Sequence, residues 1–527
     1  CYSAVTIPAL RSLSEAWLLT GDPQYGRKAA VLLARLASVY PNHDDRQDWL
    51  WAAPYGGRHP HYTWKGGGMI TDLIWETFCT EAAVYAYDAI YSYLDQDPEL
   101  IPYLQSKGMP IENVEDLRDY IHHYLLRPAA VGVLNESIRG NLGHHQALAM
   151  TLALVLDDYS DTHPNSRDMV DWAYHGGGHC AYIMPNFLRT DGGGHESPNY
   201  SRIKTDFIRV ARLMELVRER HPEQFDLQRY PDIFGDDKAR AMFDWFIDCK
   251  MLGYYTPGVG DNGGIRPPRR VLPQNYSFIG ESTAYAFEKW GDPRYARAST
   301  RADGSFFPGE LFWEYPQEEL EAALELPESQ IVARSRLLDG YGVAILESGA
   351  GDDQRAVCLN YAATVGHRQQ DTLNLEVFAR GVDILPDLGY PFTWDYRWEW
   401  DANTMAHNTV SVGESQGDIR QRMNNACSLF ASEDGVHAVT AHHDPYPAGY
   451  GHTNQAAPDV DLYERTVVLV DVDPERFYVL DLFAVQGGDQ HDQSWHGPLV
   501  EPTVPQLDWR AQPTGTLAGA DVEQFAE

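Results

Sequence analysis

The hydrophobic pattern of this chain changes near residue 330, and the change limits which folds the chain can adopt. Before residue 330, apolar residues recur at spacings of three and four, as on the buried face of a helix. After it, short apolar runs are separated by Gly, Asp and Pro, as in antiparallel sheets. We therefore predict an α+β multidomain protein, with a helical domain over residues 1–330 and an antiparallel β domain over residues 331–527.

Helical hairpins are predicted throughout the first part of the chain. Residues 7–19 and 27–39 each carry a helical pattern, and the tripeptide GDP at 21–23 ends one helix and begins the next. The same tripeptide recurs at residues 291–293. Further helices are predicted at 70–95, 115–126, 143–157, 165–185, 203–220 and 237–252. Helix pairs joined by short turns favour an (α/α) toroid or a solenoid.

Strands dominate the second part. They are predicted at 341–348, 355–363, 373–379, 408–413, 436–441, 464–471 and 476–485. Short strands with turns at close intervals favour an antiparallel β-sandwich. Residues 372–379 alternate in polarity, so we predict a half-buried strand in which Leu373 and Leu375 face the core while Asn374 and Glu376 face outward.

An excess of acidic residues limits the partners of the chain. It contains 41 Lys and Arg against 76 Asp and Glu, which gives a net charge of −35. Nucleic acid is therefore not expected as a partner, since phosphate contacts need a positive surface. A polyanionic substrate would need a binding cleft that is locally basic, because the field of the whole chain repels it.

Other features of the composition exclude further classes. No apolar run reaches the length of a membrane span, so none is predicted. The six cysteines are scattered without a CxxC pair, which argues against a thiolate metal site and a disulfide scaffold. The chain opens at Cys1 within a helical pattern, as a fragment or a mature form would, and we expect the β domain to be incomplete at its end.

A first polar cluster, RGNLGHHQ at residues 139–146, precedes a strongly apolar helix. Its polar side chains would sit at the N-terminal end of that helix, where free backbone N–H groups attract anions. The cluster is either a helix cap with surface histidines or a site that binds a carboxylate and transfers a proton.

A second cluster, DGGGHESPNY at residues 191–200, leads into another predicted helix. Three glycines allow a backbone to approach a ligand closely, but the spacing and the Lys of a phosphate-binding loop are missing. The cluster is therefore either a helix-entry turn capped by Glu196 or Ser197, or a loop that presents polar side chains to a ligand.

A third cluster spans residues 366–410 in the β part. His367 and Asp371 stand at the head of a strand, DLG at 387–389 ends a second strand, and HNT at 407–409 follows four aromatic residues. Titratable groups at strand ends beside tryptophans and tyrosines suit a sheet edge that faces a sugar polymer.

In this order the three clusters resemble the motifs of the heparinase II/III-like polysaccharide lyases, a superfamily that also includes toroid-type alginate lyases. The family pattern in the β part is roughly His-x-His-x-Asp, then Gly, Asp-x-Gly and His-Asn-Thr. Here it reads HRQQD at 367–371, Gly381, DLG at 387–389 and HNT at 407–409. The resemblance implies an N-terminal helical toroid, a C-terminal β-sandwich, and cleavage of a uronic-acid-containing polysaccharide by β-elimination.

The resemblance also implies roles for individual residues. Asn141, His145, Tyr200 and His367 match catalytic positions, although His144 can be aligned in place of His145. The histidine and the tyrosine would then act as an acid–base pair, and His367 would complete the site from the β part.

A structural zinc ion is implied at Asp387 and His407, and no cofactor is needed for the chemistry itself. Gln369 stands where family members have a second histidine, and an amide oxygen is a poor zinc ligand. His367 lies two residues earlier on the same face of the strand and could substitute. The alternative is that Asp387 caps a turn and His407 forms a hydrogen bond in the core.

β-Elimination from a uronate gives these residue types their roles. The carboxylate must be neutralised, a base must take the C5 proton, and an acid must protonate the departing O4. Asn141 with Arg139, His144 or Gln146 could donate hydrogen bonds to the carboxylate. Histidine titrates near neutrality and suits the base, and tyrosine can donate to O4. Which of the two acts as base stays open, because a cationic site can also lower the pKa of a tyrosine.

Additional side chains are predicted to contact the sugar chain, because aromatic rings stack on sugars and polar groups bind their hydroxyl and acidic groups. They are His195, Glu196, Trp64, Arg397, Trp398 and Tyr463, with Arg465 on the same strand as Tyr463.

Two other functions remain open at this point. A toroid-type glycoside hydrolase would need two carboxylates that flank the scissile bond, and Glu196 and Asp371 are the candidates. A non-catalytic carbohydrate-binding protein would need only the aromatic residues. We favour the lyase because it uses the histidine and tyrosine clusters. It implies a secreted or periplasmic protein whose partner is an anionic polysaccharide of glycosaminoglycan or alginate type.

Overall fold

The computed structural model describes most of the chain. The described residues are 5–42, 70, 74–253, 256–262, 280–301, 303–307, 313, 315–332, 334–362, 367–390, 400–413, 425–443 and 460–497. Their contacts divide the chain into two compact units. One, the helical unit, comprises residues 1–183 and 203–235, and the other, the mixed unit, comprises residues 184–202 and 236–527.

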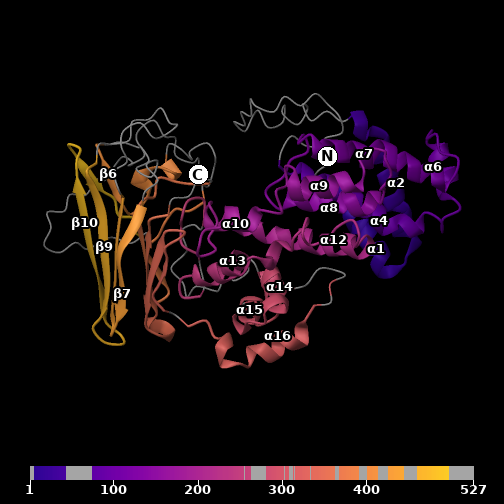
Figure 1. Ribbon diagram of the computed structural model, residues 1–527. Helices are drawn as coiled ribbons and strands as arrows, with labels where there is room; N and C mark the ends of the chain where they lie inside the picture. Colours follow the sequence, from indigo (N-terminus) through magenta and orange to yellow (C-terminus); the bar gives the residue numbers. More distant parts are fainter. Residues whose placement is uncertain are drawn as a thin grey trace, which may run out of the picture. The chain divides into compact units, whose positions relative to one another are not determined.

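The helical unit is built from short and medium helices. Its α-helices are α1 (Ile7–Thr20), α2 (Pro23–Val39), α4 (Glu76–Ile90), α5 (Leu100–Ser106), α6 (Val114–Ile121), α7 (Arg127–Leu134), α8 (His144–Leu156), α9 (Ser166–His175) and α12 (Phe207–Arg220). Helix α8 is apolar along most of its length and packs against α4, α9 and α12, so it forms the centre of this unit (Figure 1).

Turn chemistry explains how the first two helices are joined. Gly21 adopts a left-handed conformation with φ of +65° and its N–H donates to the carbonyl of Trp17, which ends α1. The Asp22 carboxylate then accepts from the N–H of Gln24 and begins α2. The second GDP tripeptide works in the same way before α15 (Pro293–Ala298), where Asp292 accepts from the next helix. The predicted hairpin turns are confirmed.

The mixed unit combines the remaining helices with all the strands. Its helices are α10 (Ile183–Phe187), α11 (Pro198–Ser201), α13 (Asp237–Asp248), α14 (Gly280–Trp290), α15 and α16 (Gln317–Leu324). Its strands are β1 (Arg336–Leu338), β2 (Val343–Ser348), β3 (Arg355–Asn360), β4 (Asn374–Ala379), β5 (Val382–Leu385), β6 (Val410–Val412), β7 (Asn425–Glu433), β8 (Val436–His443), β9 (Leu462–Asp471), β10 (Phe477–Gln486) and β11 (His491–Gln493).

The strands form antiparallel sheets. The first runs in chain order from β1 to β5, the second has the order β10-β9-β8-β7, and β11 pairs with β6. Strands β10 and β9 of the second sheet lie side by side in Figure 1. In the first sheet Leu359 of β3 lies opposite Leu375 of β4, and in the second Val439 of β8 lies opposite Val467 of β9. These residues belong to one hydrophobic core, which therefore joins strands of both large sheets.

The predicted mixture of helices and antiparallel strands is confirmed, and most predicted elements lie within a few residues of those observed. The helix predicted at 165–185 ends instead at His175, because the glycines at 176–178 follow it. The change from helices to strands falls near residue 330, but α13 to α16 belong to the same compact unit as the strands. The division into domains at 1–330 and 331–527 stays a prediction.

One prediction about burial is wrong. Strand β4 was expected to be half-buried, yet Asn374, Glu376 and Phe378 on its polar face are all buried. The segment 256–262 supplies the cover, since the N–H of Gly258 donates to the Glu376 carboxylate over 2.7 Å. A covered sheet face can therefore carry polar residues when each has a hydrogen-bond partner.

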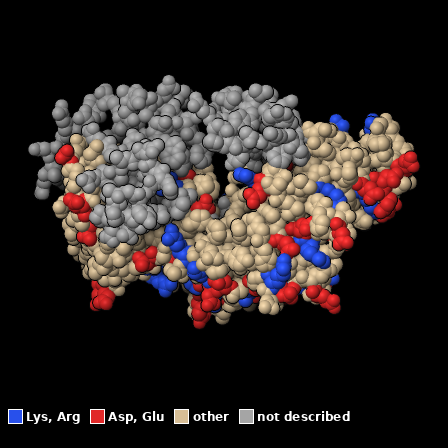
Figure 2. All heavy atoms as spheres, turned by 45° about the horizontal axis from the view of Figure 1, so that its top comes forward, with Lys and Arg blue, Asp and Glu red and all other residues tan. Residues whose placement is uncertain are grey.

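The surface of the described residues carries its excess acid in several groups. Figure 2 shows clusters of Asp and Glu side chains, with Lys and Arg side chains lying between them. Among the described residues, no helix is long and apolar enough to cross a membrane.

Candidate functional site

Tyr200 and His367 form a flat ring stack within the mixed unit. Their ring centroids lie 3.4 Å apart and their planes differ by 3°. The hydroxyl of Tyr200 lies 2.9 Å from that of Tyr390, and Nδ1 of His367 lies 3.2 Å from a carboxylate oxygen of Glu196. The structure thus brings together three predicted site residues and Tyr390, which the sequence analysis did not select.

Local backbone geometry holds this stack in place. Tyr200 lies in the single turn α11, which begins with a proline at its first position. His367 has φ of +49°, a left-handed conformation that is uncommon for a residue other than glycine. Its carbonyl oxygen accepts a 2.8 Å hydrogen bond from the N–H of Asp261. A Cβ at Gly260 would lie 2.4 Å from that oxygen, so the segment 256–262 can pass this close only with glycine there.

The glycine triplet before Tyr200 has a structural role. Gly192 has φ of +88°, and a Cβ there would lie 2.1 Å from the backbone of Ala241 on α13. Asp191 fixes the loop by accepting from the N–H groups of Gly193 and Tyr341. The close approach predicted from these glycines is therefore an approach to a helix of the same unit. Neither Glu196 nor Ser197 caps α11 with its side chain. The hydroxyl of Ser197 instead donates to the carbonyl of Asp261.

In the helical unit, His145 lies in the first turn of α8. Its ring centroid is 4.5 Å from that of Trp172, and its Nε2 is buried without a hydrogen-bond partner among the described residues. The pKa of His145 is lowered to about 4, mainly by burial and also by the charge of Arg139, while a hydrogen bond with the backbone of Ile138 opposes the shift. His145 is therefore a neutral imidazole at neutral pH, with a ring nitrogen able to accept a proton.

The residues on either side of His145, Gln146 and His144, both have polar partners within the helical unit. Gln146 is buried and acts as a cap: its side-chain oxygen accepts from the N–H of Gly143 over 2.8 Å, and its nitrogen donates to the carbonyl of Gly178 over 2.9 Å. Its polar atoms are engaged within the fold, which argues against the predicted contact with substrate. His144 pairs with Asp206 at 2.5 Å.

Two further predicted residues of this cluster lie nearer the surface. Arg139 is exposed and donates from Nε to the carbonyl of Glu136 over 2.7 Å. Asn141 is half-buried, and its carbonyl accepts from the N–H of His145. Both residues therefore precede α8 at the end where its first N–H groups lie, as the sequence analysis expects.

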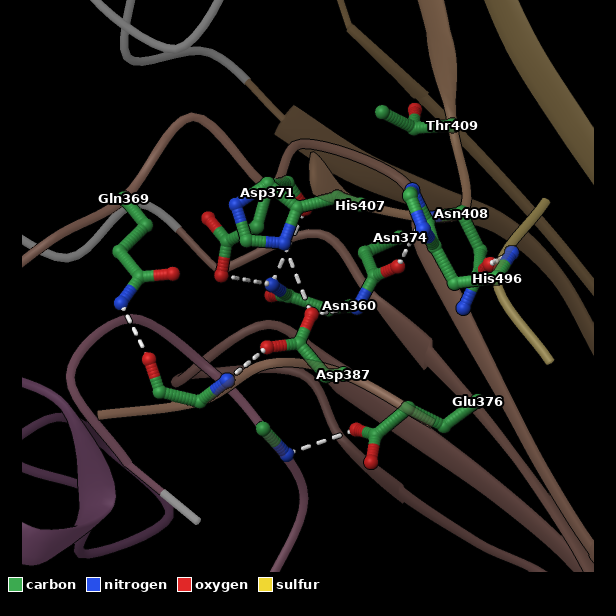
Figure 3. A network of polar contacts seen from close by, with 12 residues as sticks. Asn360, Gln369, Asp371, Asn374, Glu376, Asp387, His407, Asn408, Thr409 and His496 are labelled. Carbon is green, nitrogen blue, oxygen red and sulfur yellow. Dashed lines mark hydrogen bonds and ion pairs between the residues drawn. The ribbon is translucent and has the colours of Figure 1, made fainter. Parts of the chain in front are cut away.

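Asp387 and His407 lie together in the mixed unit and both are buried. His407 Nδ1 donates to Asp387 Oδ2 over 2.8 Å, and the other carboxylate oxygen accepts from the N–H of Gly389 over 2.7 Å (Figure 3). Asn374 donates to the same carboxylate over 2.8 Å. Both parts of the alternative interpretation are therefore observed, since the carboxylate caps a turn and the histidine is hydrogen-bonded in the core.

The rest of the HNT motif ties strands together. The N–H of Asn408 donates to the Asn374 side chain, and its own side chain donates to the carbonyl of Pro386. The hydroxyl of Thr409 donates to the carbonyl of Thr372 over 2.7 Å. These contacts give the motif a role in joining β4, β5 and β6.

The residues at the implied zinc position do not fit a zinc ion. Among the described residues, no group of three or more His, Cys, Asp or Glu side chains is arranged to hold a metal. The only metal-binding side chains of the set, Asp387 and His407, are hydrogen-bonded to each other, and Gln369 takes the third position. His367 does not substitute for it, because its ring stacks on Tyr200.

Tyr463 was predicted to contact substrate, and its burial argues against this. Its hydroxyl donates to the carbonyl of Val410 over 2.6 Å and lies 2.9 Å from that of Thr409, inside the core. Arg465 is also fully buried, where it pairs with Asp481 at 2.8 Å. Both residues lie on the same face of β9 as Val467 and Leu469, and the sequence pattern did not show that this face is covered.

The other predicted contacts are less constrained. His195 is half-buried, with its ring centroid 5.5 Å from that of Phe187. Trp64, Arg397 and Trp398 lie outside the described residues. Tyr390, which the sequence analysis passed over, follows the Asp-x-Gly motif directly, and that position was the one available signal for it.

Comparison with known proteins gives one family and a common fold. Residues 356–518 match the family model described as heparinase II/III-like, C-terminal. No curated protein matches the chain.

Similar solved structures include a heparinase III with methylated lysines, at 14% identity and a TM-score of 0.51, covering 93% of this chain and 65% of that one. The heparan sulfate lyase HepC from Pedobacter heparinus has 15% identity and a TM-score of 0.51, with 91% and 61% covered. Another heparinase III has 15% identity and a TM-score of 0.51, with 87% and 62% covered.

The chain thus spans less than two thirds of the length of each of these proteins, and at these identities the likeness shows a shared fold. The match of residues 356–518 covers β4 to β11 and the whole third motif. Residues 356–518 therefore match the C-terminal domain of heparinase II/III-like proteins, and this match supports the superfamily that the motifs predict.

Proposed function

We propose that this protein is a polysaccharide lyase that cleaves a uronic-acid-containing anionic polysaccharide by β-elimination. The observation that carries the proposal is the stack of Tyr200 on His367, with the Tyr200 hydroxyl hydrogen-bonded to Tyr390. A phenol held by a second phenol and backed by an imidazole is suited to proton transfer. The same residues have no evident role in packing the core, since Tyr200 and His367 are only partly buried.

The proposal assigns each step of the elimination to a residue. A base removes the C5 proton, the C4–O4 bond breaks as the C4–C5 double bond forms, and an acid protonates O4. His145 and Tyr200 are proposed as this acid–base pair. Neutral His145 has a bare Nε2 that can accept a proton, and its lowered pKa keeps it in that form at neutral pH.

The substrate carboxylate needs donors that stabilise the enediolate formed when the C5 proton leaves. We propose Asn141 and Arg139, which precede the N-terminal end of α8, for this role, with His144 beside them. His367 would act beside Tyr200, and Glu196, which contacts its ring, would orient it. Arg202 and Arg368, which follow Tyr200 and His367 closely in the chain, are proposed as the basic residues that an acidic polymer requires.

The proposal extends to the fold and the setting. We propose that the helices belong to an (α/α) toroid and that the two large sheets, which share one core, form a β-sandwich. Because the polymer would be extracellular, we propose a secreted or periplasmic protein. Glycosaminoglycans and alginates both provide the uronate that the mechanism requires.

The glycoside hydrolase alternative is less well supported. It needs Glu196 and Asp371 as two carboxylates on either side of a bond. Asp371 is fully buried, and its Oδ2 accepts 2.8 Å hydrogen bonds from the N–H of Gly260 and the side chain of Asn360. A carboxylate engaged in this way holds the segment 256–262 and is poorly placed to meet a sugar.

The test is the ultraviolet absorbance of the unsaturated uronate during incubation with alginate, heparan sulfate, hyaluronan, chondroitin sulfates and ulvan. Wild type should raise the absorbance on at least one polymer, and Tyr200→Phe and His145→Ala should abolish the rise. Tyr478→Phe is the matched control, because Tyr478 is 53% exposed on β10. New reducing ends without absorbance would replace elimination by hydrolysis, and binding without either product would indicate a non-catalytic protein.

A further inference from the structure

Gln369 is a buried side chain whose orientation is fixed by its partners. Its amide nitrogen donates to Asp261 Oδ1 over 3.1 Å and to the carbonyl of Gly389 over 2.6 Å (Figure 3). Both partners are acceptors only, so the amide oxygen cannot exchange places with the nitrogen. Gln369 therefore acts here as a two-hydrogen donor that links the segment 256–262 to the turn after β5.

The Asp387 carboxylate beside it is already satisfied by hydrogen bonds. Both oxygens of Asp387 are engaged, one by the N–H of Gly389 and the other by Asn374 and His407. Within the side chains of Gln369, Asp387 and His407, the atoms without a hydrogen-bond partner among the described residues are His407 Nε2 and Gln369 Oε1. These two neutral atoms could coordinate a metal, but zinc in proteins is held by at least three protein ligands.

We infer that Gln369 takes over the bracing role that a metal would have at this place, and that the Asp387–His407 pair is held by hydrogen bonds alone. The carboxylate orients His407, and the amide of Gln369 joins the two segments that a metal with three ligands would otherwise tie together. The fit of the donor set, with an amide in place of an imidazole, is what carries this inference.

The same hydrogen bonds make Gln369 a positioning residue for the stack. Its acceptor Gly389 directly precedes Tyr390, whose hydroxyl meets that of Tyr200. Its other acceptor, Asp261, donates from its N–H to the carbonyl of His367. Gln369 is therefore linked on one side to Tyr390 and on the other to His367, and this second part of the inference rests on the proposed function.

Metal binding tests the first part directly. Wild type, Gln369→His and the double variant with His407→Gln are incubated with zinc chloride, passed through a desalting column and assayed for metal. Wild type should retain no stoichiometric zinc, and its Tm should not change with a chelator. Gln369→His adds the missing imidazole and should retain about one zinc per chain, with a Tm that falls on chelation, and the double variant should lose it.

Retention of stoichiometric zinc by wild type, with a Tm lowered by chelator, would overturn the inference. So would a Gln369→His variant that folds with the wild-type Tm and retains no zinc. These readouts need no substrate, so they stand even if no polymer is cleaved and the proposed function fails.

Substitutions that keep the size of the side chain test the positioning role. Gln369→Met removes both donors and should lower the Tm, and it should lower kcat about tenfold with little change in KM, because a misplaced acid–base group slows the chemical step. Gln369→Glu presents a carboxylate to two acceptors, and protonation at low pH returns one donor. Its kcat relative to wild type should therefore recover as the pH falls, which a simple packing defect would not do. Equal kcat and Tm in wild type and Gln369→Met would refute the role.

Discussion

Acidification should destabilise the helical unit through His145. Burial lowers the pKa of this residue from 6.5 to about 4. Between these pH values the unfolded chain binds a proton at His145 that the folded chain excludes. The contribution of His145 to the free energy of unfolding is therefore complete above pH 6.5 and declines as the pH falls toward 4. The shift corresponds to a loss of about 3 kcal/mol in full, of which about 2 kcal/mol should be lost by pH 5.

The assay compares unfolding of wild type and His145→Gln by urea at pH 8 and pH 5. Glutamine stays neutral at both values, so the variant should lack this one contribution, and the stability difference between the two proteins should change by about 2 kcal/mol. Other groups titrate equally in both proteins and cancel. His123→Gln, which removes an exposed histidine, should follow wild type.

A local probe is available as well. The ring of Trp172 lies 4.5 Å from that of His145, so protonation of the imidazole should quench its fluorescence. The difference in emission between wild type and His145→Gln should show a midpoint near pH 4. If the stability difference is the same at pH 8 and pH 5, and the fluorescence midpoint lies near 6.5, the burial argument for a neutral His145 is refuted.

Three further predictions concern other parts of the chain. Tyr390→Phe removes the 2.9 Å hydrogen bond to Tyr200 and should slow elimination about fivefold, and an unchanged rate would separate Tyr390 from the proton transfer. Gly192→Ala should prevent folding of the mixed unit, because a Cβ there meets backbone at 2.1 Å, whereas Gly21→Ala, with open space around it, should cost only about 1 kcal/mol in thermal or urea unfolding. Arg465→Met leaves the partly buried carboxylate of Asp481 on β10 and the carbonyls of Leu373 and Asn408 without their donor, and it should cost about 3 kcal/mol in urea unfolding, of which only a part should be regained when Asp481 is also replaced by Leu.

The parts of the fold that the sequence predicts well are those fixed by neighbouring residues. The turn between α1 and α2 depends on a left-handed Gly21 and a capping Asp22, and both are visible in the sequence. The burial of Glu376 was missed because its cover, the segment 256–262, lies more than a hundred residues away along the chain. Alternating polarity identifies a strand, but it does not show what lies against its polar face.

The site divides in the same way. The motifs identified Tyr200 and His367, which the structure places in one stack. They did not reveal Tyr390, because its hydrogen bond is made only in the folded chain. The amide of Gln146, which could bind a carboxylate, instead satisfies the first turn of its own helix in this structure. Residue type alone does not distinguish these uses.

The left-handed backbone of His367 links the segment 256–262 to the ring stack through main-chain contacts. The N–H of Asp261 holds the His367 carbonyl, and Gly260 passes it too closely for any other residue. Changes in this segment would rotate a peptide plane and thereby tilt the imidazole that lies flat on Tyr200. Variants that change the rate of the proposed elimination should therefore be sought among residues 256–262, as long as Gly260 is kept.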